Sequence, residues 1–404
     1  MKPLVSFALL WLSQCCRFFA DYTLRLFVVQ ETASQFSRGS EAAWHTVVAI
    51  FMVPATLLPP VYGALGNTYP KRQVLFYSAL SCWLVLIPFL WLGQGLWWFL
   101  AVALVSLGSS LYSPIRHAIL PAAAHDLGWK LPLVMGWIEM GAILSMVLGM
   151  ATGSYLQPMR WSSLGWDGSL PGVPALYVVL MLNLSATLLC WPIYFASDVC
   201  RPEPLLLAWR GFVQDLYRLL ALPATRIPLL GVALLRGLVT AAVGAFVADA
   251  LTRAVGATPP LTVLLAIAIA STLGMACGSL LAGWITNKAR PLYWIPLWAF
   301  LLTCTLFLGA WMHEKPAWLL FVAGTLGGLL NVPLLSAYQA HTPADARGNA
   351  MAILNSLGCF SMALVSAIFA GLAWLGWLPT HLQFWFITIL AALCSGLAWR
   401  YLSR

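Results

Sequence analysis

Three charged side chains lie inside the first long apolar stretch of the sequence, and their spacing places them on one side of a helix. Arg17, Asp21 and Arg25 follow one another at intervals of four residues, which is about one helical turn. A charge at the centre of a membrane helix costs about 2.5–3.5 kcal/mol on insertion scales, so these residues are not expected to face lipid. We predict that they line a translocation path, or else form a buried ion cluster that only locks helices together.

The composition is that of a protein that crosses a membrane many times. Of its 404 residues, 61% are hydrophobic and only 8% are charged, and the mean hydropathy is +0.87. A soluble domain carries about a quarter of charged residues, because its surface faces water. The 21 Trp residues fit a chain with two extensive membrane–water interfaces.

Several functional classes are disfavoured by what the sequence contains. The net charge of +9 comes from basic residues scattered among short loops, so we expect no nucleic-acid partner. The 9 Cys residues are dispersed without C-x-x-C spacing, which favours packed, reduced thiols and predicts no metal site. We find no H-E-x-x-H, no G-x-S-x-G and no Gly-rich loop ending in Lys-Ser/Thr, and therefore expect neither an enzyme nor a cofactor.

Apolar segments of about 20 residues recur along the chain, and each is long enough to span a bilayer. They predict an all-α membrane protein with twelve transmembrane helices, near 4–30, 43–66, 72–92, 96–120, 131–156, 173–196, 227–252, 260–286, 291–312, 317–339, 348–375 and 381–402. The first segment is expected to be an uncleaved helix, because charges follow within the same span.

The basic residues predict the orientation of these helices. With both termini in the cytoplasm, most Lys and Arg side chains outside the spans fall on the cytoplasmic side. The opposite side then holds only Arg38, Arg160, Arg253 and Lys315.

The longest polar interval, 198–226, is predicted to join two six-helix halves at 1–197 and 227–404. Within it Arg210, Gln214 and Arg218 repeat every four residues. An apolar stripe accompanies them, made of Leu206, Trp209, Val213, Leu216 and Leu220. This pattern predicts an amphipathic helix lying on the cytoplasmic leaflet, with a soluble linker helix packed on the bundle as the alternative.

The two halves carry a similar short segment at equivalent places. Each has Gly, an aliphatic residue two positions later, Asn four positions later and then basic residues. These residues are Gly63, Asn67, Lys71 and Arg72 in the first half and Gly283, Asn287 and Lys288 in the second. Such weak duplication is typical of a transporter built from two pseudo-symmetric halves.

The segment 63–75 resembles the signature between helices two and three of the major facilitator superfamily, G-x-L-a-D-r-x-G-R-K-x-x-L. Gly63, Lys71 and Arg72 fit this signature, whereas Asn67 stands where the family usually has Asp and Pro70 where it has Gly. The resemblance implies the major facilitator fold and alternating access. The family's Asp makes a charged contact that holds the halves in one state, and Asn can replace only its hydrogen bond.

Two further stretches resemble bacterial lysophospholipid transporters, namely Tyr-Ser-Pro-Ile-Arg at 112–116 and Gly-Trp-Ile-Glu at 136–139. This resemblance implies a monomeric flippase-like carrier in the bacterial cytoplasmic (inner) membrane. It would move lysophosphatidylethanolamine or lysophosphatidylglycerol to the inner leaflet, where a partner acyltransferase/acyl-carrier-protein synthetase re-esterifies them. The matching charged positions are Asp21, Arg116 and Glu139.

These charged residues have both functional and structural interpretations. Asp21 and Arg116 would form a pair that changes partners between states and offers Arg to a lipid phosphate, or would form a static bridge. Glu139 is expected to bridge to Arg116, with a lipid ammonium group or a proton as alternative ligands. Arg236 is a second phosphate ligand or a side chain that extends to the interface.

The sequence departs from that family in the second half. The family's basic residue in helix seven falls near Val243, whereas this chain offers Arg236. The family's acidic residue after the Leu357-Gly358 pair is also replaced, by Cys359. A proton-coupled carrier of another amphipathic solute or drug is therefore the second functional interpretation. A membrane acyltransferase or scaffold subunit is the third, which the missing catalytic chemistry disfavours.

Overall fold

The computed structural model describes residues 2–32, 47, 50–93, 95–156, 173–198, 200, 208–253, 261–286, 292–312, 317–343, 346–374 and 380–402. Throughout these ranges the regular structure is helical and strands are absent. The predicted all-α class is confirmed.

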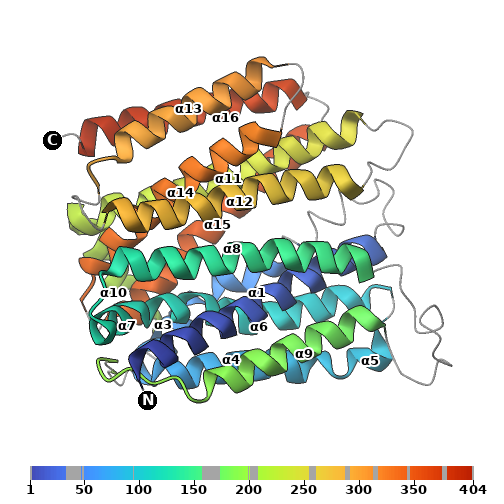
Figure 1. The fold of residues 1–404 in the computed structure, drawn as a ribbon, viewed down its shortest axis with the longest axis vertical. Helices are drawn as coiled ribbons and strands as arrows, with labels where there is room; N and C mark the ends of the chain where they lie inside the picture. Colours follow the sequence, from blue (N-terminus) through green and yellow to red (C-terminus); the bar gives the residue numbers. More distant parts are fainter. Residues whose placement is uncertain are drawn as a thin grey trace. The chain divides into compact units, whose positions relative to one another are not determined.

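The helices follow one another as labelled in Figure 1. The first are α1 (Pro3–Thr32), α3 (Pro59–Thr68), α4 (Lys71–Leu86), α5 (Phe89–Leu92), α6 (Trp97–Ala118), α7 (Leu120–Leu127), α8 (Leu131–Leu156) and α9 (Pro174–Cys190). They are followed by α10 (Ala208–Ala221), α11 (Pro223–Arg253), α12 (Leu261–Thr286), α13 (Ile295–Trp311), α14 (Ala317–Ala340), α15 (Arg347–Trp374) and α16 (Thr380–Leu402).

Among the described residues, nine helical segments are long and apolar enough to cross a membrane. Two shorter apolar helices, α9 and α13, accompany them. Together with the helical residues between 50 and 68, these elements correspond one to one to the twelve predicted spans. The ends differ most at α9, which ends at Cys190 and not at 196. α11 begins at Pro223 and not at 227, since Pro is favoured in the first turn of a helix.

Proline and glycine residues set several helix ends. α3 begins with Pro59 and Pro60 and ends at Thr68, before Tyr69, whose ψ of 153° is extended. Pro70 follows, which has no N–H to continue the hydrogen bonds of α3, and α4 begins after it. α7 ends at Gly128, whose φ of 67° lies in the left-handed region that glycine adopts without steric cost.

The chain forms two compact units. Unit 1 consists of Met1–Gly128, Leu144–Arg218 and Pro343–Ser356. Unit 2 consists of Trp129–Ile143, Leu219–Thr342 and Leu357–Arg404. The start of α8 therefore packs within unit 2, and the start of α15 packs within unit 1. The predicted division of the sequence into 1–197, 198–226 and 227–404 stays a prediction.

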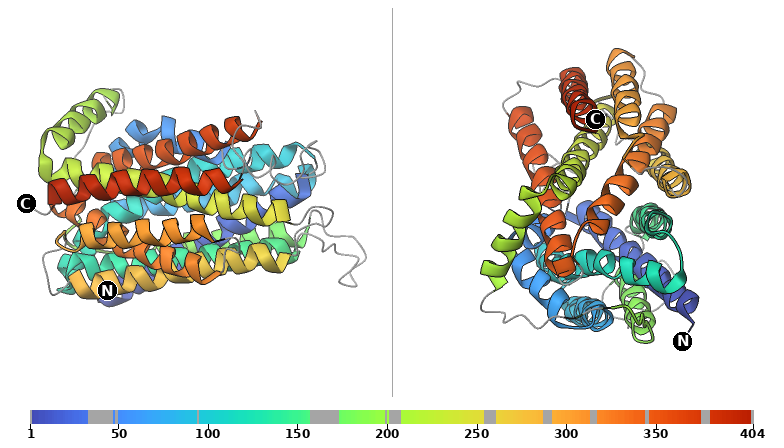
Figure 2. Two further views of the ribbon diagram at one scale, coloured as in Figure 1. Left: turned by 90° about the horizontal axis from the view of Figure 1, so that it is seen from above. Right: turned by 90° about the vertical axis from the view of Figure 1, so that its left-hand side faces the viewer.

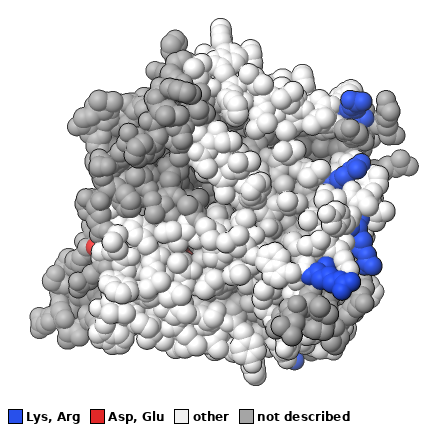
Figure 3. All heavy atoms as spheres, turned by 180° about the vertical axis from the view of Figure 1, so that it is seen from behind, with Lys and Arg blue, Asp and Glu red and all other residues white. Residues whose placement is uncertain are grey.

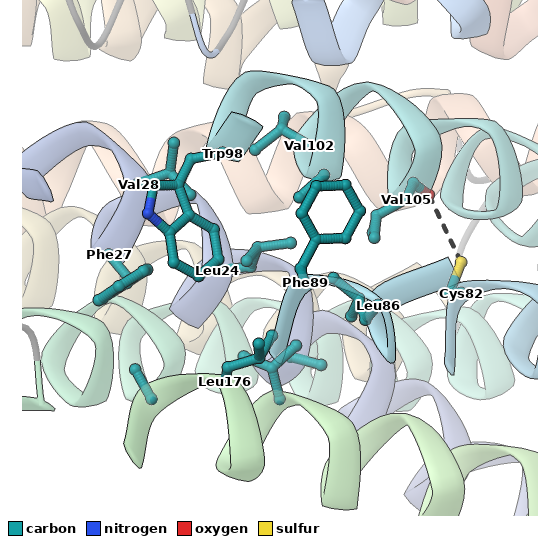
Figure 4. Close-up of a cluster of buried hydrophobic side chains, with 14 of the residues drawn as sticks. Leu24, Phe27, Val28, Cys82, Leu86, Phe89, Trp98, Val102, Val105 and Leu176 are labelled. Carbon is teal, nitrogen blue, oxygen red and sulfur yellow. Dashed lines mark hydrogen bonds between the residues drawn. The ribbon is translucent and has the colours of Figure 1, made fainter. Parts of the chain in front are cut away.

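In unit 1, α1 packs against α9 and α6, and α4 packs against α6 and α9. An apolar core lies between them (Figure 4). Its largest member, Trp98, meets Phe27 edge to face with ring centroids 5.0 Å apart. Leu24, Leu86 and Phe89 belong to the same cluster. This apolar core surrounds the end of α1 that follows its charged residues.

In unit 2, α12 packs along α14 through small residues on both helices. Gly274 and Gly278 of α12 and Gly324 and Gly328 of α14 are each four residues apart. A Cβ atom at Gly328 would lie 2.6 Å from the backbone nitrogen of Ser279, so no larger side chain fits there. Such spacing of small residues allows membrane helices to approach closely. α13 and α16 form a second close pair in this unit (Figure 2).

The described surface is mostly apolar. On the face drawn in Figure 3, the described residues show a small number of basic side chains and a small acidic spot, and the rest of them are uncharged. Large hydrophobic side chains such as Trp91, Phe300 and Leu393 are exposed. Water would not tolerate so much exposed apolar surface, but lipid does.

Candidate functional site

The three charged residues of α1 are buried within unit 1. The exposed fraction is 1% for Arg17, 6% for Asp21 and 8% for Arg25. Their spacing by one turn puts them on the same buried side of the helix. Because burying an unpaired charge is expensive, each of them must meet compensating groups.

Arg17 and Asp21 form an ion pair within α1. The distance from Arg17 Nη1 to Asp21 Oδ1 is 2.6 Å. Ser109 of α6 donates its hydroxyl to Asp21 Oδ2 at 2.7 Å. Oδ2 of Asp21 therefore accepts a hydrogen bond from a neighbouring helix, and Oδ1 lies beside a cation of its own helix.

Arg17 also joins α1 to three other helices. Its Nη1 donates to Asn183 Oδ1 of α9 at 2.6 Å, and its Nη2 donates to Cys82 Sγ of α4 at 2.7 Å. Nη2 also contacts the hydroxyl of Ser109 in α6. We call Arg17, Asp21, Cys82, Ser109 and Asn183 the Arg17 cluster. This arrangement fits the ion cluster that locks helices together.

Arg25 is held by aromatic rings. Its guanidinium carbon lies 4.5 Å from the ring centroid of Tyr22 and 3.3 Å from that of Phe51. The negative face of an aromatic ring attracts a cation, and this attraction strengthens where water is excluded. Arg25 is therefore stabilised by aromatic rings and Arg17 by a carboxylate, although both residues lie four positions from Asp21 in the sequence.

Arg116 of α6 lies against the preceding turns of α1. It is 5% exposed, and its Nη1 donates to Gln14 Oε1 at 2.8 Å. Its guanidinium carbon lies 4.4 Å from the ring centroid of Phe18. Neither of these two groups carries a charge.

In this structure Asp21 forms an ion pair with Arg17, and the predicted pair between Asp21 and Arg116 stays a prediction. A partner one turn away on the same helix closes such a pair without any displacement of neighbouring helices. Both residues are nevertheless buried in unit 1, as their intramembrane positions implied.

The segment 63–75, which runs from α3 into α4, contacts the start of α15 within unit 1 through its α3 residues. Asn67 Oδ1 accepts a hydrogen bond from the backbone nitrogen of Gly348 at 2.8 Å. N–H groups in the first turn of a helix have no partner inside that helix, so Asn67 supplies one for α15. Gly63 lies so close to Asn349 that a Cβ atom would come within 2.9 Å of the Asn349 Cα. Gly63 and Asn67 thus both belong to the contact between α3 and the start of α15.

The two basic residues of this segment differ in their surroundings. Lys71 is buried, and its Nζ lies 2.6 Å from Asp198 Oδ1. Its backbone nitrogen donates to the other oxygen of Asp198 at 3.0 Å. Arg72 is exposed, with its guanidinium carbon 5.9 Å from the ring centroid of Tyr194. The corresponding Asn287 and Lys288 of the second half lie outside the described residues.

Glu139 and Arg236 belong to unit 2 and are both partly buried. Arg236 of α11 lies over Gly358 of α15, where a Cβ atom would come within 2.7 Å of Arg236 Cδ and Nη1. The glycine leaves room for the Arg236 side chain. The sequence analysis named Arg236 and the Leu357-Gly358 pair as two separate departures from the family, and in the structure they lie side by side.

Sequence reasoning missed three members of the Arg17 cluster: Cys82, Ser109 and Asn183. Asn183 carried a detectable signal, because it is the one amide residue in the apolar helix α9. Cys82 and Ser109 carried none, since small polar residues are common in membrane helices. Within the described residues, no group of three or more His, Cys, Asp or Glu side chains is placed to hold a metal ion.

Comparison with known proteins gives the family and the fold. Residues 10–366 match the family model described as Major Facilitator Superfamily. A search of curated proteins finds no match.

Solved structures resemble nearly the whole chain. The human organic anion transporter MFSD10 (TETRAN) is similar with a TM-score of 0.77 and 15% identity, over 98% of this chain and 100% of that chain. The proton:xylose symporter XylE is similar with a TM-score of 0.71 and 15% identity, over 99% of this chain and 96% of that chain. The transporter FucP in its outward conformation is similar with a TM-score of 0.65 and 12% identity, over 98% of this chain and 99% of that chain.

Proposed function

The chain belongs to the major facilitator superfamily and crosses a membrane several times, and we propose that it is an alternating-access carrier of lysophospholipids. It moves lysophosphatidylethanolamine or lysophosphatidylglycerol to the inner leaflet of the bacterial cytoplasmic membrane for re-acylation. The proposal includes both termini in the cytoplasm, action as a monomer, and an acyltransferase/acyl-carrier-protein synthetase as partner.

The buried guanidinium of Arg116 carries this proposal. It is positioned by the uncharged Gln14 and Phe18. The planar fork of a guanidinium suits a phosphate, and the bond is strong where water is excluded. The phosphate is the group that lysophosphatidylethanolamine and lysophosphatidylglycerol share.

The remaining charged residues have supporting roles in this proposal. Arg17 and Asp21 hold α1 in place beside Arg116, because their partners come from α4, α6 and α9. Within unit 2, Glu139 offers a partner to the ammonium group of a lipid and Arg236 offers a phosphate ligand. Apolar faces of the helices accommodate the single acyl chain.

A proton-coupled carrier of another amphipathic solute or drug is the alternative. The same guanidinium would bind a carboxylate as well as a phosphate. The two functions differ in what must move: a lipid between leaflets, or a soluble molecule across the bilayer.

The test is transport by the purified protein in vesicles. We expect fluorescent lysophosphatidylethanolamine and lysophosphatidylglycerol to move between leaflets faster than in protein-free vesicles, and diacyl phospholipid to move far more slowly. Arg116→Gln should slow both lyso-lipids, and Arg116→Lys should restore part of the rate because it keeps the charge. Arg226→Gln, at an exposed position, is the matched control and should change neither.

Two outcomes would overturn the proposal. One is an absence of lyso-lipid movement above the protein-free control together with accumulation of a soluble carboxylate-bearing drug driven by a proton gradient, which favours the alternative. The other is equal movement of lyso-lipids by the wild type and by Arg116→Gln, which removes Arg116 from head-group binding.

A further inference from the structure

Helix α10 has two faces with different surroundings. One side chain on its inner face, Asp215, has an exposed fraction of 13%. Directly opposite, Trp209, Val213 and Tyr217 are exposed by 60%, 42% and 71%. Residues two positions apart lie on nearly opposite sides of a helix, so Val213 and Asp215 point away from one another.

The outer face combines apolar and basic residues. Trp209, Val213 and Tyr217 form one exposed stripe, spaced by four residues, and Arg210, Gln214 and Arg218 form an exposed stripe beside it. The sequence predicted one apolar stripe that included Leu216 and Leu220, but these two residues are partly buried. Trp and Tyr favour the membrane–water interface, and basic side chains next to them favour anionic lipid head groups.

The inner face touches the start of α15. Asn349 donates its side-chain amide to Asp215 Oδ2 at 2.7 Å. Its own side-chain oxygen is buried and has no hydrogen-bond partner. The same first turn of α15 is held from α3 through Gly348 and Asn67. The bond to Asp215 and the bond to Asn67 both hold the first turn of α15.

Asp215 also connects the two faces of α10. Its Oδ1 lies 3.7 Å from Nη1 of Arg218, which is 77% exposed. Arg218 and Asn349 share the carboxylate of Asp215. A lipid phosphate that binds Arg218 would draw the guanidinium away, and the carboxylate would then bond to Asn349 alone.

We propose that the outer face of α10 is a binding site for an anionic lipid surface, and that Asp215 transmits its occupancy to the start of α15. Trp209, Val213 and Tyr217 insert into the leaflet beside α10, and Arg210 and Arg218 bind its phosphates. Occupancy fixes α10 and strengthens the bond from Asn349 to Asp215. The lipid is a regulator here, and the proposal does not depend on what the carrier transports.

Hydrogen–deuterium exchange of the full chain in lipid nanodiscs tests this proposal. The comparison is between phosphatidylcholine alone and phosphatidylcholine mixed in equal parts with phosphatidylglycerol. We expect the anionic lipid to slow exchange at 208–218 by about fivefold for each Arg that contacts it. Exchange at 347–356 should slow in the same discs.

Three variants separate the steps. Arg210→Gln with Arg218→Gln should abolish the lipid dependence at both segments, whereas the control Arg226→Gln should keep it. Asp215→Ala should raise exchange at 347–356 in both lipids and remove its lipid dependence. It should leave the lipid dependence at 208–218 in place, because both basic side chains remain.

The proposal fails if exchange at 208–218 is the same in the two kinds of disc, in which case the exposed face of α10 serves a protein partner. It also fails if the double Arg variant keeps the lipid dependence. If exchange in the wild type slows at 208–218 but does not change at 347–356, Asp215 does not transmit lipid binding to α15, and that part of the proposal is wrong.

Discussion

Neutralising Asp21 should destabilise the protein strongly, through the charge that it leaves behind. Asp21→Asn keeps the size of the side chain but removes the partner of Arg17, which is 1% exposed and lies 2.6 Å from the carboxylate. Removing one member of a buried ion pair costs about 3–5 kcal/mol, because the other charge stays buried without compensation. Asn183, Cys82 and Ser109 still contact Arg17, so we expect the lower end, about 3 kcal/mol.

A double-mutant cycle identifies the partner. Arg17→Met added to Asp21→Asn should restore at least half of the lost stability, because no uncompensated charge then remains. The assay is the free energy of unfolding in mixed micelles titrated with a denaturing detergent and followed by circular dichroism. Arg226→Gln, at an exposed position, should change this free energy by at most about 0.5 kcal/mol.

Two results would refute this reasoning. A loss below about 1 kcal/mol for Asp21→Asn would place the Arg17 pair in the range of solvent-exposed ion pairs. Rescue by Arg116→Gln and not by Arg17→Met would instead identify Arg116 as the partner of Asp21, as the sequence suggested.

Three further predictions concern other parts of the chain. Gly348→Ala should slow transport and raise hydrogen exchange at the start of α15, because the added Cβ atom would lie 2.7 Å from the backbone oxygen of Gly63. Gly396→Ala is the control and should do neither, since a Cβ atom there would have no neighbouring atom within 4 Å. Burial and the nearby Asp198 carboxylate raise the pKa of the Cys200 thiol. The rate at which maleimide labels Cys200 should therefore reach half of its maximum above about pH 8.5. A midpoint at or below that pH would contradict this. In sealed cells, an impermeant label should reach a Cys placed at 38 or 315 and not one at 71 or 288; labelling at 71 or 288 would break the proposed topology.

The membrane spans and the position of Arg17 and Asp21 on one side of α1 could be predicted, because both depend on spacing within one segment. Hydropathy over a window of about 20 residues locates a span whatever its neighbours are. An interval of four residues places two side chains on one side of a helix, which is why the spacing identified Arg17 and Asp21 together. The same rule grouped Arg25 with them, although Phe51, on another segment, is what stabilises it.

What could not be predicted depends on contacts between helices. Nothing in the spacing of α1 indicates that Asn183 lies opposite Arg17, since 166 residues separate them. The bond between Asp215 and Asn349 joins residues 134 positions apart and depends on which side of α10 faces inward. The predicted apolar stripe of that helix mixed exposed Trp209 and Val213 with partly buried Leu216 and Leu220 for the same reason.

The energies of these contacts indicate which of them a transport cycle can break. Opening the Arg17–Asp21 pair would leave a buried charge at about 3–5 kcal/mol, so we expect the Arg17 cluster to move as one body with α1. The bond from Gly348 to Asn67 joins two neutral groups and contributes about 0.5–1.5 kcal/mol, whereas an Asp at this position would give about 1.5–3 kcal/mol. Asn67 therefore weakens the hold of α3 on α15 relative to the family's usual Asp. The additional bond from Asn349 to Asp215 holds the same turn of α15 from α10 and offsets part of that loss.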